Sequence, residues 1–133
     1  MRVVIDTNVL VSGLLSPYGP AAEIARMLVA GSVELLYDAR IVSEYEEVLL
    51  RPKFSFDKVK VACLVEFITH FGIPVSAMPL PRHLPDPDDE PFLEVAIAGK
   101  GQCLITGNIT HYPAKTRNKI RVLTPRQFLN RYF

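Results

Sequence analysis

The 133-residue sequence lacks the features of several common protein classes. Its two cysteines, Cys63 and Cys103, lie far apart in apolar surroundings, so we expect reduced core thiols and no disulfide. No apolar run is long enough to span a bilayer, and Asp6 and Asn8 interrupt the apolar N-terminus, unlike a secretory leader. We therefore expect a cytoplasmic protein that does not associate with membranes.

Two common ligand-binding patterns are also missing. The histidines His70, His83 and His111 are dispersed, and neither cysteine has a second sulfur nearby, so zinc spacing is absent. No glycine-rich phosphate loop with a lysine occurs, which argues against a nucleotide kinase or GTPase. Internal repeats, low-complexity segments and linkers are absent as well, so residues 1–133 are expected to form a single domain.

Acidic residues are absent from the C-terminal segment, residues 100–133. This segment carries 7 Lys or Arg and no acid, a balance of +7. Residues 1–99 carry 8 basic and 14 acidic residues, a balance of −6, so the net charge of +1 hides an asymmetry. The basic segment is either a solvated tail or a surface that holds phosphates near an acidic site.

Strands and helices are expected to alternate along the chain. Apolar, β-branched runs predict five strands, at residues 3–5, 33–37, 73–76, 103–105 and 120–123. Helical spacing of apolar residues and capping signals predict helices at residues 20–30, 39–51 and 57–70, after 90 and after 124. No element is predicted for residues 7–18. Such alternation is typical of an α/β protein with a parallel sheet covered on both faces.

Polar residues follow two of the predicted strands, where ligands commonly bind in open parallel sheets. Asp6 and Asn8 follow the first strand, and the run Thr106–Asn108 follows the fourth. Glu44 lies on the flank of the apolar stripe of the second helix. A carboxylate turned toward a sheet costs several kcal/mol unless it is paired or bound to metal, so either Arg40 neutralises Glu44 or a metal does.

The stretch PDPDDEPF, residues 85–92, crowds four carboxylates into one loop. Two carboxylates about 4 Å apart repel by roughly 4 kcal/mol at an effective dielectric near 20. Asp88 or Asp89 could cap the following helix, but one cap needs only one acid. The others are explained if at least one joins Asp6 and Glu44 around a hard cation, Mg²⁺ or Mn²⁺. Such ions commonly act on phosphates.

Three stretches together resemble the PIN domain: VVIDTNVLVSGLL at the start, SEYEEVL at 43–49 and DPDDEPFLEVAIAGKGQCLITGN at 86–108. The resemblance is closest to bacterial toxin components of toxin-antitoxin systems, related to VapC-type ribonucleases, and covers essentially the whole chain. It implies a three-layer α/β/α sandwich with a central parallel five-stranded sheet. It also implies an endoribonuclease that uses Mg²⁺ or Mn²⁺, held by catalytic residues Asp6, Glu44 and Asp89. Asp86 or Asp88 could replace Asp89 in that role.

One position departs from the family pattern. Most members have an acid after Thr-Gly or Thr-Arg at the end of the fourth strand, whereas this chain has Asn108. The resemblance gives Asn108 and Asn8 a role in orienting water or the scissile phosphate, with Thr106 supporting the site. It further implies RNA as substrate, an antitoxin protein as partner and a homodimer.

Two hypotheses compete with this one. The first is a non-catalytic RNA-binding or regulatory module that keeps the fold but binds metal too weakly for turnover. The second, a receiver or phosphatase-like protein with Asp6 as nucleophile, has less support, because no lysine lies near the acids to steady a phosphoryl group.

Overall fold

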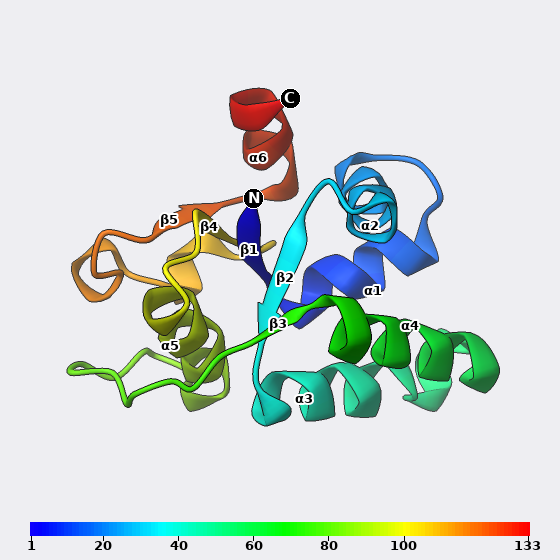
Figure 1. Cartoon of the computed structure of the whole chain (residues 1–133), viewed down its shortest axis with the longest axis horizontal. Helices are drawn as coiled ribbons and strands as arrows, with labels where there is room; N and C mark the ends of the chain where they lie inside the picture. The colour runs from blue at the N-terminus through cyan, green and yellow to red at the C-terminus, as the bar shows by residue number, and fades with distance from the viewer.

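In a computed structural model, which describes residues 1–133, five parallel strands form one sheet in the order β3-β2-β1-β4-β5 (Figure 1). Central β1 pairs with β2 and β4, so that Val3 lies opposite both Leu35 and Cys103. The strands are β1 (Arg2–Ile5), β2 (Glu34–Tyr37), β3 (Ile73–Pro74), β4 (Cys103–Ile105) and β5 (Arg121–Leu123). The apolar runs of the three inner strands, β1, β2 and β4, are buried, as strands covered on both faces require.

Helices cover both faces of this sheet. They are α1 (Thr7–Leu15), α2 (Pro20–Ala30), α3 (Ala39–Leu49), α4 (Lys58–Phe71), α5 (Glu90–Ala98) and α6 (Pro125–Tyr132). Four 3₁₀ turns lie in the connections: η1 (Pro52–Phe54) between α3 and α4, η2 (Pro87–Asp89) before α5, and η3 (Ile109–His111) and η4 (Ala114–Thr116) between β4 and β5. Helix α5 packs against β1, β2 and β4, while α1, α2 and α4 lie on the opposite side (Figure 1). The predicted three-layer sandwich with five parallel strands is confirmed.

The helix boundaries follow local chemistry. The Asp38 carboxylate accepts a hydrogen bond from the Ile41 amide at 3.1 Å and begins α3. Thr124 and Gln127 form a reciprocal capping box at the start of α6. Gly31 ends α2 at φ 83°, in the left-handed region that glycine adopts without steric cost.

Two sequence predictions are wrong. Residues 7–15 form α1, although no element was predicted there; Gly13 lets α1 approach α2, since a Cβ at Gly13 would lie 2.9 Å from the Ala21 carbonyl oxygen. Cys63 is exposed rather than in the core, because it lies two residues, about 200° of helical rotation, beyond buried Val61 on α4. Cys103 is buried, and both thiols are free as predicted.

No helix in the structure combines the length and apolar character needed to cross a bilayer.

Candidate active site

Asp6 ends β1 at the carboxyl edge of the sheet and is only 5% exposed. Its Oδ2 atom accepts hydrogen bonds from the Thr106 hydroxyl at 2.8 Å and the Tyr112 hydroxyl at 3.1 Å. Burial raises the pKa of Asp6, and these two hydrogen bonds only partly offset the rise. The segment after β4 therefore fixes the orientation of the carboxylate that follows β1.

Glu44 lies half-buried on α3 and accepts a hydrogen bond from the Thr7 hydroxyl. The next residue, Tyr45, is fully buried and donates to the Ile5 carbonyl, which ties α3 to the end of β1. Burial raises the pKa of Glu44, and the charge of Asp6 raises it further.

Arg40 does not neutralise Glu44, so that alternative from the sequence is wrong. Its guanidinium instead pairs with Asp38 and Glu94, each at 2.7 Å. A spacing of four residues on α3 would allow Arg40 to reach Glu44. The Arg40 guanidinium is instead hydrogen-bonded to Asp38, which begins α3, and to Glu94 of α5. Neither lysine nor arginine pairs with Glu44.

Asp89 ends η2 with 14% of its side chain exposed. Its Oδ2 atom is buried without an aligned hydrogen bond, although His111 Nδ1 lies 3.2 Å away. Burial raises the pKa of Asp89 to about 6, with further contributions from the negative charges of Asp6 and Asp86. Asp89 is thus a carboxylate with one buried oxygen that lacks a hydrogen bond, and the negative charge of Asp6 repels it.

The remaining acids of the loop have separate tasks. Asp86 caps η2 by accepting a hydrogen bond from the Asp88 amide at 2.9 Å, and Asp88 itself is exposed. Glu90 accepts from the Leu84 amide at 2.9 Å and thereby holds the loop. Asp89 occupies the N-cap position of α5, as the capping alternative allowed, but its side chain accepts no hydrogen bond from the helix, so capping does not explain its carboxylate.

The polar residues predicted to position water or phosphate surround the segment after β4. The Asn8 side-chain oxygen accepts from the Gly107 amide at 3.2 Å, and the Thr106 hydroxyl accepts from the Asn108 amide at 3.1 Å. The Asn108 side chain is exposed and makes no hydrogen bond within the protein. Asn8 and Thr106 therefore shape the segment through its backbone amides, while the side-chain amide of Asn108 faces solvent.

Sequence reasoning missed four residues at this site: Thr7, Tyr45, His111 and Tyr112. Thr7 and Tyr45 are the chain neighbours of Asp6 and Glu44, and the other two lie in the stretch TGNITHYP. Adjacency to predicted acids was the available signal. The contacts themselves join residues 22 to 106 positions apart, which a single sequence does not reveal.

The donor chemistry of Asp6, Glu44 and Asp89 fits a hard divalent cation. All three carboxylates have a raised pKa, and Asp89 presents a buried oxygen without a hydrogen bond. A nearby cation would offset both the desolvation and the mutual repulsion. As placed, however, no three His, Cys, Asp or Glu side chains are close enough to form a metal-binding group.

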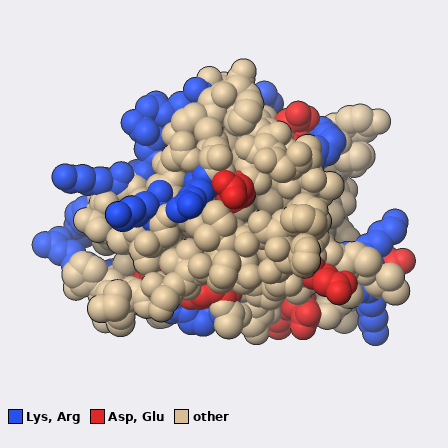
Figure 2. All heavy atoms as spheres, viewed as in Figure 1, with Lys and Arg blue, Asp and Glu red and all other residues tan.

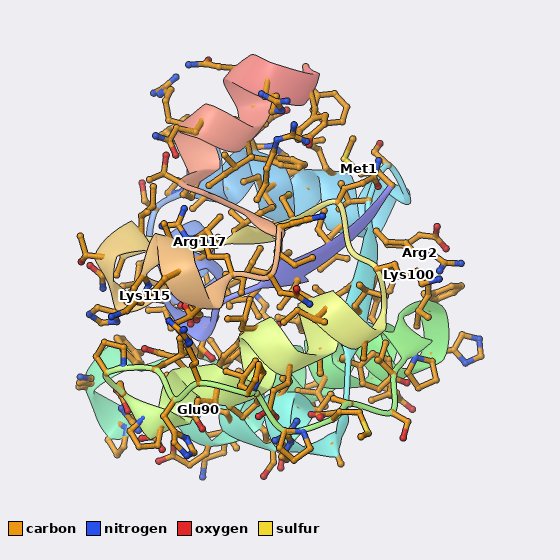
Figure 3. All side chains as sticks on the ribbon, turned by 90° about the vertical axis from the view of Figure 1, so that its left-hand side faces the viewer. Met1, Arg2, Glu90, Lys100, Lys115 and Arg117 are labelled. Atoms are coloured by element: carbon orange, nitrogen blue, oxygen red, sulfur yellow. The ribbon has the colours of Figure 1, made fainter.

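Basic residues gather beside this acidic edge. Blue Lys and Arg side chains crowd the left of the molecule in Figure 2, where Figure 1 draws the η3–η4 segment, and several acids line the lower edge. Figure 3 shows Lys115 and Glu90 on two segments that face each other, with Lys115 above and Glu90 below. His111 and Asp89 connect these two segments.

The fold and the site define an α/β protein with three carboxylates, Asp6, Glu44 and Asp89, near the carboxyl edge of a parallel sheet. A family model described as PIN domain matches residues 2–110, and the chain belongs to the PIN domain family. The predicted resemblance is therefore confirmed. No curated protein is similar enough in sequence to match.

Among solved structures, the chain is similar to one described as the crystal structure of FitAcB from Neisseria gonorrhoeae. The two share 17% identity with a TM-score of 0.59, over 93% of this chain and 98% of that chain. At this identity the likeness shows the α/β fold.

Proposed function

We propose that residues 1–133 form a single nuclease domain, a divalent-metal-dependent endoribonuclease that hydrolyses RNA phosphodiester bonds. One observation carries the proposal: Asp6, Glu44 and Asp89 come from three separate elements, have raised pKa values and pair with no lysine or arginine. A structural ion-pair network would instead contain such a partner. Membership of the PIN family, whose members are in general nucleases, supports the same chemistry.

Asp6, Glu44 and Asp89 would hold Mg²⁺ or Mn²⁺. When bound, such an ion favours deprotonation of water and offsets charge on a phosphate. Thr106 and Tyr112 orient Asp6 by donating to its Oδ2 atom, and Thr7 orients Glu44.

The side-chain amide of Asn108, which is exposed, would contact a phosphate oxygen or a water at the rim of the site. The Asn108 side chain makes no hydrogen bond within the protein, whereas the Asn8 side-chain oxygen accepts one from the Gly107 amide. The basic residues of the C-terminal segment supply the positive charge that attracts an RNA backbone.

The motif resemblance to bacterial toxins supports a role as the toxin component of a toxin-antitoxin system. That role includes an antitoxin protein as partner, a homodimer and a cytoplasmic location.

Cleavage of a labelled mixed-sequence RNA by the purified protein tests the proposed activity. We expect cleavage with Mn²⁺, none with EDTA, and none by Asp6→Asn with either. The matched control is Glu46→Gln, which removes an exposed acid from α3 and should cleave like the parent. Equal cleavage by Asp6→Asn and the parent would contradict the assignment.

The second candidate function is a non-catalytic RNA-binding module. Asn108, in place of the acid that the family pattern has there, favours it because an amide brings no charge to a cation. Mn²⁺-independent RNA binding without cleavage by the parent protein would support this candidate over the nuclease.

A further inference from the structure

A polar groove lies between α6 and the segment that contains η3 and η4. It encloses about 570 Å³, within the roughly 300–1,000 Å³ of typical ligand sites. We call it the C-terminal groove, and its polar lining consists of Arg117, Gln127, Asn130 and Arg131. Ile109, Val122 and Leu123 form the apolar remainder, so no acidic residue lines it.

The polar side chains of this groove retain donors that the protein does not use. Arg117 uses only its Nε–H, which donates to the Tyr112 carbonyl at 2.6 Å, so its two terminal NH₂ groups make no hydrogen bond within the protein. Gln127 uses its oxygen to accept from the Thr124 amide at 3.0 Å, which leaves its amino group free. Asn130 makes no side-chain hydrogen bond, and Arg131 forms no ion pair but lies over the Tyr132 ring, 5.8 Å from its centroid. Two guanidinium groups and two amides thus face an acid-free groove.

One buried residue, Tyr112, connects Arg117 of the groove with Asp6. Arg117 holds the Tyr112 carbonyl, and the hydroxyl of the same Tyr112 donates to Asp6. Ile109, which lines the groove, directly follows Asn108 in the chain. In Figure 3, Arg117 lies on the segment below α6, on the same side as Lys115. The groove therefore runs from Ile109, next to Asn108, to α6.

We propose that the C-terminal groove binds the sugar-phosphate backbone of the RNA next to the scissile bond. Arg117 and Arg131 contact phosphates, and Gln127 and Asn130 contact sugar or base edges. Arginine forks match phosphate oxygens, and amides can both donate to and accept from ribose hydroxyls, a combination that suits RNA better than an acidic peptide. This inference rests on the proposed ribonuclease function and adds a substrate subsite to it.

Anisotropy titration of a fluorescein-labelled single-stranded RNA, with EDTA present, tests the subsite without any cleavage. We expect Arg131→Gln to weaken RNA binding by about fivefold and to lower the salt slope by about 0.7. The matched control is Arg126→Gln, which removes the same charge from an exposed position of α6 outside the groove. This control should change the RNA affinity by less than twofold. Asn130→Ala should weaken binding without altering the slope, because it removes no charge.

Equal effects of Arg131→Gln and Arg126→Gln would overturn the subsite and leave only diffuse attraction by the basic segment. Competition by an acidic peptide as strong as that by unlabelled RNA of equal charge would also overturn it, in favour of a protein partner. If Arg131→Gln weakens RNA binding more than Arg126→Gln does but the parent shows no Mn²⁺-dependent cleavage, the subsite stands and the nuclease function is contradicted. If the parent cleaves RNA but the two variants bind it equally, the nuclease function stands and the subsite is contradicted.

Discussion

One carboxylate oxygen of Asp6 accepts hydrogen bonds from two hydroxyl groups, and both belong to the segment that follows β4 in the chain. Thr106 is adjacent to the strand, whereas fully buried Tyr112 reaches back from beyond η3. Since both donors favour the charged form of Asp6, they keep a buried carboxylate ready for a cation. The site therefore depends on Thr106 and Tyr112, which orient Asp6, as well as on the acids themselves.

Tyr112→Phe tests this positioning. Loss of one hydroxyl to Asp6 should lower the free energy of unfolding by about 1–2 kcal/mol, and cleavage should fall more than RNA binding, because Asp6 is less well oriented. Tyr37→Phe provides the control: it removes a hydroxyl bonded to the Thr69 carbonyl at 3.0 Å, away from the site. Urea unfolding and initial cleavage rates would measure both effects. A loss of cleavage as large in Tyr37→Phe as in Tyr112→Phe would show a purely structural effect.

The raised pKa of Asp89 predicts a pH-dependent stability in the metal-free protein. The folded state keeps the proton up to about pH 6, whereas an ordinary aspartate loses it near 3.8. The unfolded state therefore binds fewer protons between these values, and the contribution of Asp89 to stability falls as pH rises from about 4 to about 6. It stays low above that range.

Asp89→Asn should remove this loss. With EDTA present, we compare the gain in free energy of unfolding of the variant over the parent at two pH values. We expect this gain to be larger at pH 7.5 than at pH 4, by about 1–2 kcal/mol. Urea unfolding at the two pH values measures the difference, and Asp88→Asn, at an exposed position of the same loop, is the control. A gain that is the same at both pH values would rule out relief of a buried charge.

At the scale of elements, the sequence was most informative where apolar periodicity and caps agree. All five strands and five of the six helices lie where they were predicted, and α1 was missed because the polar side chains of Asp6 and Asn8 interrupt its apolar run. Parallel topology explains why Asp6 and Thr106 meet, since both follow neighbouring strands. The Tyr112–Asp6 and His111–Asp89 contacts depend on how loops fold back, which no local pattern encodes.

Helix α5 also holds the long loop that precedes it. The 7%-exposed Glu94 accepts from the Leu80 amide at 3.2 Å and pairs with Arg40 at 2.7 Å, so one carboxylate joins the loop to α3. Glu94→Gln should lower stability by about 1–2 kcal/mol and speed proteolysis of the loop. Glu47→Gln breaks only the exposed Arg51 pair and should cost at most about 0.5 kcal/mol. Equal proteolysis rates in the two variants would contradict this role.

Across the whole molecule, part of the acidic charge faces the basic segment. Several acids lie along the lower edge in Figure 2, while others lie elsewhere on this face, and the acid-free segment from β4 to α6 occupies the left and top of Figure 1. Such a field attracts phosphates to the basic side, while a cation at the acidic side would accept them. The arrangement fits a protein that processes a polyanion better than one that only stores a metal.

Isothermal titration calorimetry with Mn²⁺ tests most directly whether Asp6, Glu44 and Asp89 form one metal site. The parent should bind close to one ion per chain. Asp6→Asn and Asp89→Asn should each weaken binding by at least about tenfold, since carboxylates dominate the affinity of hard cations. Glu46→Gln, which lies on the exposed side of α3, should bind like the parent. Equal Mn²⁺ affinity in the parent and Asp6→Asn would contradict the account.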